Sequence, residues 1–134
     1  MFYSSFCGVK VRVFKTKWMA RFQRRQKVLD SDLLEAIIRA ERGLMDADLG
    51  GGLIKQRVAR KGQGKSGGYR MIVAYRAQNR AVFLYAFAKN ERENISPDEL
   101  VALRIVGSNW MNADAGVIAK ALEDGALQEV KNEE

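Results

Sequence analysis

Two strand patterns separated by a short connection are the feature that most limits how this chain can fold. Residues 69–76 and 81–88 are both rich in β-branched, aromatic and aliphatic residues, and the four residues between them have the length of a hairpin connection. The second pattern is apolar on both of its faces, which is typical of a central strand in a covered sheet. The sequence therefore predicts an antiparallel hairpin at the centre of a sheet.

The N-terminal part combines one strand pattern with two helical patterns. Residues 9–14 alternate apolar and basic side chains, which predicts a half-buried strand. Apolar residues then recur at helical spacing in residues 18–22. A second helix is predicted to begin at Asp32, because Asp32 and Glu35 have the spacing of a capping box. We expect the two helices to form a helical hairpin that packs against the sheet.

The segments around the central hairpin predict one more strand, two loops and C-terminal helices. Residues 53–60 have a strand pattern, whereas the glycine-rich residues 46–52 and 61–68 predict loops. A capping box at residues 96–99, with proline at the first helical position, predicts a helix start, and residues 113–122 predict a second amphipathic helix.

The predicted fold class is therefore α+β. We expect an antiparallel sheet of about four strands packed against the N-terminal helical hairpin, with helices at the C-terminus. Because the sequence shows no internal repeat and no linker, residues 1–134 are interpreted as a single domain.

Charge is distributed unevenly along the chain, which carries 23 Lys and Arg against 16 Asp and Glu. Residues 9–27 and 55–80 contain basic but no acidic residues, whereas the tail after Arg104 is net acidic. Two basic tracts in a folded domain attract phosphates and favour a polyanionic partner over an ordinary solubilising surface. Charge alone does not distinguish RNA, DNA, a membrane surface or an acidic protein.

The composition also excludes several kinds of chemistry. The chain contains no histidine, so a Ser-His-Asp triad, a Cys-His nucleophile, a histidine-ligated metal site or a ribonuclease with paired histidines is excluded or difficult to build. Catalysis would have to use Lys, Arg, Tyr or carboxylates, and we expect no metal and no other cofactor. Cys7 has no partner for an internal disulfide, and no apolar run approaches the roughly 20 residues of a membrane span. With no signal peptide recognised, we expect a cytoplasmic protein that does not bind membranes.

The predicted hairpin register brings basic residues from separate segments together. If Tyr75 pairs with Val82, Arg70 lies opposite Phe87. The segments that then meet at one end of the sheet are residues 60–65, 69–70 and 89–92. The alternative is that these cations face solvent or pair with neighbouring carboxylates and the acidic tail.

A cluster of this kind can supply ribonuclease chemistry without a metal. The reaction requires a base for the ribose 2′-hydroxyl, positive charge at the phosphate and a proton for the 5′-oxygen leaving group. Repulsion between the cations lowers lysine pKa values, so a lysine in the cluster can act as the base. Tyr69 either stacks on an exposed base or packs at the end of its strand.

Three stretches of the sequence resemble a known family. They are Gly-Lys-Ser-Gly-Gly-Tyr-Arg at residues 64–70, Phe-Leu-Tyr-Ala-Phe-Ala-Lys-Asn-Glu-Arg-Glu-Asn-Ile at residues 83–95, and the helix start at residues 96–100. In this order they resemble the RelE/HigB-like toxins of type II toxin-antitoxin systems, over approximately residues 9–106. Residues 107–134 lie outside this resemblance and are interpreted as a helical extension that packs on the core, contacts the antitoxin or shields the basic face.

The resemblance implies a microbial-ribonuclease-like fold and ribosome-dependent cleavage of messenger RNA in the decoding site. It also implies neutralisation by a cognate antitoxin, often one with a helix-turn-helix domain. The toxin would contact operator DNA only through this antitoxin. Two alternatives remain. One is inhibition of DNA gyrase, as in the related ParE toxins, and the other is a basic nucleic-acid-binding module without toxicity.

The resemblance further implies which residues form the site. The base maps to Lys61 or Lys65, the arginine that holds the scissile phosphate maps to Arg70, and a further cation is Lys89 or Arg92. Asn90 occupies the position where some relatives carry an arginine acid, and the aromatic residue that some relatives carry near residues 95–96 is absent. Arg92 and Tyr69 are the hypothesised substitutes for the acid and for the stacking partner. The residues expected to contact RNA are Lys55, Arg57, Arg60, Tyr69 and Asn90.

Overall fold

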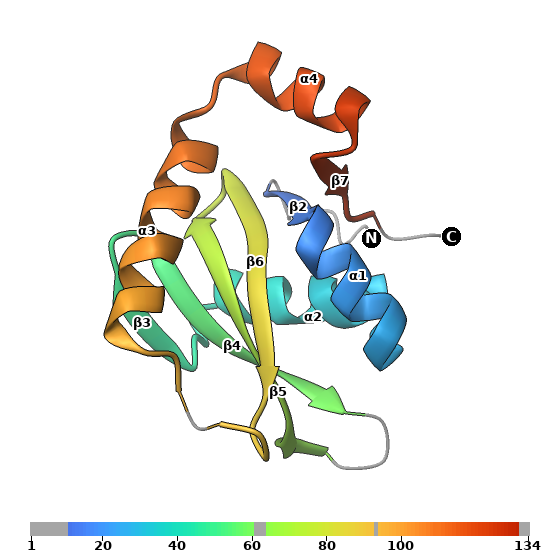
Figure 1. The fold of residues 1–134 in the computed structure, drawn as a ribbon, viewed down its shortest axis with the longest axis vertical. Coiled ribbons are helices and arrows are strands. Elements are labelled where there is room, and N and C mark those ends of the chain that lie inside the picture. The colour runs from blue at the N-terminus through green and yellow to red at the C-terminus, as the bar shows by residue number, and fades with distance from the viewer. Residues whose placement is uncertain (1–10, 61–63, 93, 132–134) are drawn as a thin grey trace.

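The fold is a mixed β-sheet with helices packed on both of its faces (Figure 1). The computed structural model describes residues 11–60, 64–92 and 94–131, with all of their side chains except those of residues 60 and 64–67. The strands are β2 (Arg12–Thr16), β3 (Ala47–Gly50), β4 (Leu53–Arg60), β5 (Gly64–Arg76), β6 (Arg80–Ala88) and β7 (Leu127–Glu129). The helices are α1 (Lys17–Gln26), α2 (Asp30–Glu41), α3 (Pro97–Asn112) and α4 (Ala115–Asp124).

The sheet has the strand order β3-β4-β5-β6-β2-β7. The predicted α+β class is confirmed, but the expected antiparallel sheet of about four strands is wrong. The described sheet has six strands, and β2 pairs with β6 in parallel. The two edge strands β3 and β7 are too short to leave a clear strand pattern in the sequence, which is why they were not predicted.

The central hairpin has the expected register at the end that carries Arg70. Arg70 pairs with Phe87, as predicted, but near the turn Tyr75 pairs with Ala81 and not with Val82. The register shifts between the two ends because β6 contains one extra residue, Leu84, in a β-bulge. Leu84 and Tyr85 consequently pack on the same face of the sheet, although they are adjacent in the sequence.

Two segments that were predicted as loops are partly strands. Residues 64–68 belong to β5, whose Gly64 pairs with Arg60 across an irregularity in the β4–β5 ladder. Residues 47–50 form β3, which runs antiparallel to β4. Gly50 at the end of β3 and the turn residues Gly51 and Gly52 all have positive φ, which is the conformation expected of the glycines in this segment.

One face of the sheet is covered by α1 and α2. Strand β2 extends to Thr16, beyond the predicted end, and the Thr16 side chain accepts a hydrogen bond from the Met19 N–H to cap α1. Helix α2 begins at Asp30, earlier than predicted, because the Asp32 carboxylate accepts a hydrogen bond from the Leu29 N–H (2.9 Å) and so closes the first turn. Helix α1 packs on β2, β6 and β7 whereas α2 packs on β4, so the expected helical hairpin is not confirmed.

The opposite face of the sheet is covered by α3 and α4. The predicted capping box is confirmed at the start of α3, where Ser96 and Glu99 each accept a hydrogen bond from the other's N–H. Gly107 lets α3 approach the sheet closely, since a Cβ there would lie 3.0 Å from Leu53. The acidic tail packs on the core through α4 and β7, which was one of its three expected roles, and its last described element is a strand and not a helix. None of the helices in the described part of the chain is both long and apolar enough to cross a membrane.

Candidate functional site

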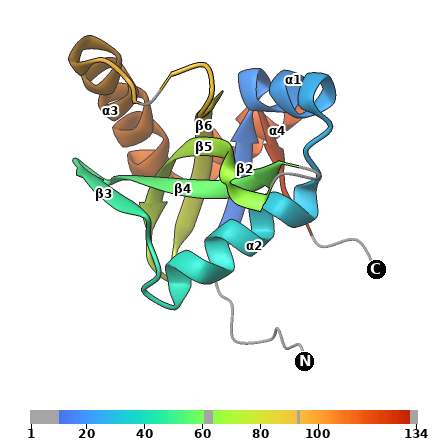
Figure 2. The same cartoon turned by 90° about the horizontal axis from the view of Figure 1, so that it is seen from below.

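Basic side chains gather where β4 and β5 pair, on the face of the sheet that also carries α3. Arg57 of β4 pairs directly with Arg70 of β5, and Lys55 lies two residues before Arg57 on the same face. In Figure 2, α3 lies to the left and α1 to the right of strands β5 and β6. We refer to Lys55, Arg57, Arg70 and Arg92 as the cationic cluster.

Arg70 is the most unusual member of the cluster. The residue is only 7% exposed, and its Nη1 atom has no hydrogen-bond partner among the described residues. The pKa of Arg70 is lowered, first by burial and then by the positive charge of Arg57, while Asp46 partly opposes this effect. A buried donor without a partner costs about 1–3 kcal/mol. The fold therefore holds a positive charge at a position where an anionic ligand would relieve an unfavourable interaction.

The position of Arg57 is fixed by contacts from outside its own strand. Its backbone N–H donates to Oδ2 of Asp46 (2.6 Å), and its Nε lies 3.7 Å from Oδ1 of the same carboxylate. Arg39 of α2 donates to the carbonyl oxygen of Arg57. About half of the Arg57 side chain remains exposed. Arg57 is thus held in place while its guanidinium stays accessible.

Arg92 reaches the same face from the segment that links β6 to α3. Its guanidinium lies 5.5 Å from the centre of the Phe87 ring and forms a two-pronged ion pair with Glu99, in which Nη1 lies 3.1 Å from Oε2. The pKa of Glu99 is lowered to about 2, chiefly by the hydrogen bond from Arg92. The pKa of Arg92 is raised, first by Glu99 and also by the nearby Tyr85 hydroxyl. Glu99 therefore holds Arg92 over Phe87, which pairs with Arg70.

The other candidate residues lie at the same end or outside the described part of the chain. The Lys89 N–H donates to the carbonyl of Gly68 (3.3 Å), so Lys89 follows β6 next to the start of the Tyr69–Arg70 segment, as predicted. Asn90 is exposed in the turn that follows. Lys61 lies outside the described residues, and of Arg60 and Lys65 only the backbone, in β4 and β5, is described.

Tyr69 packs at its strand end, which is the second of the two predicted alternatives. It is 2% exposed, its ring meets the edge of Phe22 at 5.1 Å, and its hydroxyl donates to Gln26 (2.9 Å). It lies on the α1 and α2 side of the sheet, opposite to the cationic cluster. The ring therefore offers no free face to an RNA base, and the hypothesis that Tyr69 is the stacking partner is wrong.

Two residues next to the cluster were missed in the sequence. Tyr85 lies on the face of the cluster and is half-buried, with its ring centre 4.7 Å from that of Trp18. The sequence indicates Glu99 only as a capping residue, although it also binds Arg92. The available signal for Tyr85 was a polar aromatic residue within an otherwise apolar strand, two residues before Phe87 and therefore on the same face as Arg70.

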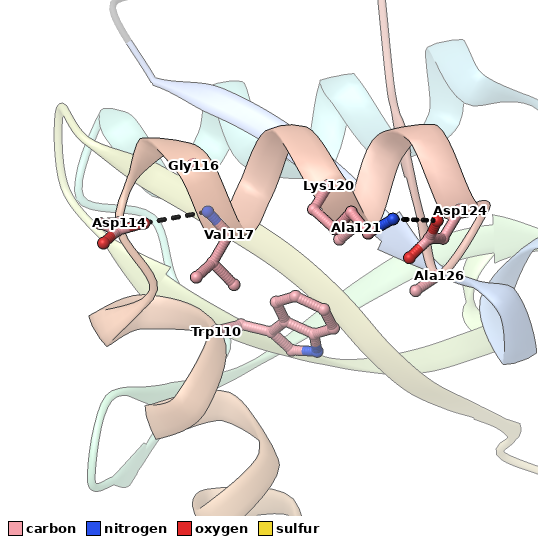
Figure 3. A pocket seen from close by; sticks show the side chains of 8 residues that line it. All are labelled: Trp110, Asp114, Gly116, Val117, Lys120, Ala121, Asp124 and Ala126. Carbon is pink, nitrogen blue, oxygen red and sulfur yellow. Dashed lines mark hydrogen bonds and ion pairs between the residues drawn. The ribbon is translucent and has the colours of Figure 1, made fainter.

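A separate hollow of about 470 Å³ lies between the end of α3 and α4 (Figure 3). Trp110 and Val117 line it, and its one basic residue, Lys120, pairs with Asp124 (3.3 Å). Trp110 is eleven residues after Glu99 on α3, which corresponds to about 16 Å along a helix. The hollow is therefore distinct from the cationic cluster and lacks a free positive charge.

The fold and the cluster define a small basic α+β protein with a group of cations at one end of its sheet. Residues 11–130 match the family model described as the RelE toxin of the RelE / RelB toxin-antitoxin system, so the chain belongs to the RelE toxin family. The match includes α4 and β7, and thus extends beyond the residues on which the resemblance was based. Comparison with curated proteins found no match. The chain is accordingly the toxin of a toxin-antitoxin pair, in a family generally of ribonuclease toxins, and family membership implies a cognate antitoxin.

Proposed function

We propose that this toxin is a metal-independent endoribonuclease that cuts messenger RNA on the ribosome and thereby stops translation. The observation that carries the proposal is the pair of arginines at the centre of the cluster. Arg57 and Arg70 pair directly across two strands, and the buried guanidinium of Arg70 has an N–H without a partner in the described structure. Two guanidiniums on one face match the charge and the donor geometry of a phosphodiester.

The chemistry assigns different tasks to different residues. Arg70 and Arg57 bind the scissile phosphate and stabilise the charge that develops on it. The base that takes the 2′-hydroxyl proton is a lysine. Lys61 and Lys65 remain candidates from the sequence, and Lys55 is a third, because it lies on the face of the cluster and has no ion pair among the described residues. Attack of the 2′-oxygen on phosphorus then breaks the bond to the 5′-oxygen and leaves a 2′,3′-cyclic phosphate.

The partners follow from this activity. We propose that the toxin acts in the cytoplasm, where it meets ribosomes and messenger RNA, and that an antitoxin with a helix-turn-helix domain neutralises it. Lys89 and Asn90 lie at the same end of the sheet as the cluster, so we assign them to contacts with the RNA on either side of the cut. The net charge of +7 increases the rate of encounter with any polyanion but carries no sequence preference.

Cell-free translation with the purified toxin tests this proposal without a need for the antitoxin. We expect protein synthesis to stop and primer extension to show new 5′ ends within the coding sequence. Arg70→Ala should reduce the cutting rate by at least about a hundredfold, since it removes a phosphate-binding group. Arg76→Ala is the matched control, because Arg76 is an exposed arginine on the same strand, about 20 Å away.

The results separate the competing functions. Inhibition of purified gyrase without RNA cuts would refute the proposal in favour of a ParE-like activity. Salt-sensitive binding to arbitrary RNA with neither cuts nor arrest would favour a simple nucleic-acid-binding module. Equal loss of cutting in Arg70→Ala and Arg76→Ala would show that the site is assigned wrongly.

A further inference from the structure

The source of the proton for the leaving group is not explained by the cationic cluster. When the RNA backbone breaks, the 5′-oxygen leaves with a negative charge and needs a proton. Arg92 was the candidate from the sequence, but its ion pair with Glu99 raises its pKa, so its guanidinium releases a proton less readily than an unpaired arginine would. A neutral O–H donor next to the cluster would serve better.

Tyr85 is the tyrosine whose position fits this requirement. It pairs with Ile72, next to the Arg70–Phe87 pair, so Tyr85 and Arg70 are diagonal neighbours on one face of the sheet. Diagonal neighbours have Cα atoms about 7–8 Å apart, within reach of two long side chains. The hydroxyl of Tyr85 also lies close enough to the guanidinium of Arg92 to affect its pKa. Tyr85 therefore lies beside two members of the cationic cluster, Arg70 and Arg92, of which Arg70 is assigned to the phosphate.

The ring of Tyr85 is held in place by aromatic neighbours. Its centre lies 4.7 Å from the Trp18 ring and 6.3 Å from the Phe87 ring. Trp18 can make this contact because β2 pairs only with the first part of β6, up to Phe83, and α1 lies against the remaining part. Such packing fixes the direction of the hydroxyl and leaves the residue half-exposed.

The other tyrosines in the described residues do not face the cluster. Tyr69 points to the opposite side of the sheet and donates to Gln26. Tyr75 also packs on that side, where its hydroxyl binds the carboxylate of Glu41.

We propose that Tyr85 is a catalytic residue whose hydroxyl donates the proton to the 5′-oxygen leaving group. This assignment rests on the proposed ribonuclease function. The 2′-oxygen loses its proton to the lysine base and forms a bond to phosphorus, the bond between phosphorus and the 5′-oxygen breaks, and the phenolic proton moves to that oxygen. The phenolate then recovers a proton from solvent, and the lysine releases its proton to solvent.

The test compares two leaving groups on ribosome-bound messenger RNA. One RNA has the normal 5′-oxygen at a mapped cut site, and the other has a bridging sulfur there, which leaves as a thiolate and needs no proton. Tyr85→Phe keeps the ring and its contacts but lacks the O–H. We expect it to cut the normal RNA about a hundredfold more slowly than the wild type, and the sulfur RNA at a nearly unchanged rate.

Two further variants complete the design. Tyr75→Phe loses a hydroxyl away from the cluster and should cut both RNAs as the wild type does. Arg70→Ala should remain slow on both RNAs, because its loss affects the phosphate and not the leaving group. Wild-type rates on normal RNA, or equal slowing on both RNAs, in Tyr85→Phe would overturn the assignment of Tyr85 alone. A wild-type protein that cuts neither RNA would overturn the proposed function and the assignment with it.

Discussion

Replacing Arg70 by methionine should make the protein more stable while it removes the activity. Methionine keeps the unbranched apolar stem of the side chain but has no guanidinium, so it needs no partner at this buried position. The substitution removes a donor that has no partner among the described residues, and it also removes the repulsion between Arg70 and Arg57. An unsatisfied buried donor costs about 1–3 kcal/mol, and the stability gained by removing it is smaller where the guanidinium still reaches water.

We therefore expect the free energy of unfolding to increase by about 1–2 kcal/mol in Arg70→Met. For a domain of this size, that change corresponds to a rise of roughly 4–8 °C in Tm. Urea unfolding in low-salt buffer gives the free energy, and a thermal melt gives Tm. Arg104→Met is the matched control, because Arg104 donates to the carbonyls of Leu49 and Gly50 and should lose stability when it is replaced.

Phosphate provides a second measurement of the same effect. An anion that binds the native site stabilises the protein by RT ln(1 + [L]/Kd), about 1.4 kcal/mol at ten times Kd. Wild type should gain this stability from inorganic phosphate, and Arg70→Met should not. A loss of more than about 1 kcal/mol in Arg70→Met, relative to wild type in low salt, would show that the guanidinium has good partners in the native state and would refute this account of Arg70.

Three further predictions concern the surroundings of the site. The carboxyl of Glu99 should titrate near pH 2 and not near 4.5 in an NMR titration, and Arg92→Gln should move the midpoint up towards 4.5. Because the pKa is lowered in the folded state, the contribution of Glu99 to stability is complete above pH 4.5 and is lost as the pH falls towards 2. Gly107→Val should lower the free energy of unfolding by about 1–3 kcal/mol in urea, because the added side chain overlaps the sheet beneath α3. Arg80→Ala should cost about 2 kcal/mol, since Arg80 donates to main-chain carbonyls at the end of α3, whereas the exposed Arg76→Ala should change stability by less than about 0.5 kcal/mol.

Elements with strong local signals could be predicted from the sequence, and elements that depend on distant contacts could not. Strand β4 has the predicted bounds, and the capping box of α3 forms at the predicted residues, because both follow from nearby side chains. Strand β7 consists of three residues and exists because it pairs with β2, more than a hundred residues earlier in the chain. The parallel pairing of β2 with β6 likewise depends on tertiary packing and has no local signature.

The candidate site could likewise be predicted only in part from the sequence. The meeting of Arg70 with Phe87 and with the segment after β6 followed from the hairpin register. The bulge at Leu84 shifts that register by one residue near the turn, and no residue in β6 marks it as a bulge. Tyr85 lies on the face of the cluster by alternation from Phe87, so its face also followed from the register. The burial of Tyr69 depends on Phe22 and Gln26 of α1, so it could not be inferred from the Gly-Tyr-Arg segment alone.

Basic tracts in the sequence do not reveal which cations bind a ligand, because the same residue types also hold the fold together. Lys15 lies 2.8 Å from Asp30, Arg12 lies 2.9 Å from Glu129, and Arg80 donates to the carbonyl of Trp110 at 2.7 Å. Each of these cations belongs to a basic tract and is satisfied by the protein itself. Arg80 is also repelled by neighbouring arginines, but Arg70 differs because it is buried with a free donor in the described structure. A bound ligand is one explanation for an unfavourable interaction of this kind in a native fold, so the partners of a cation indicate a binding residue better than its place in a charged tract does.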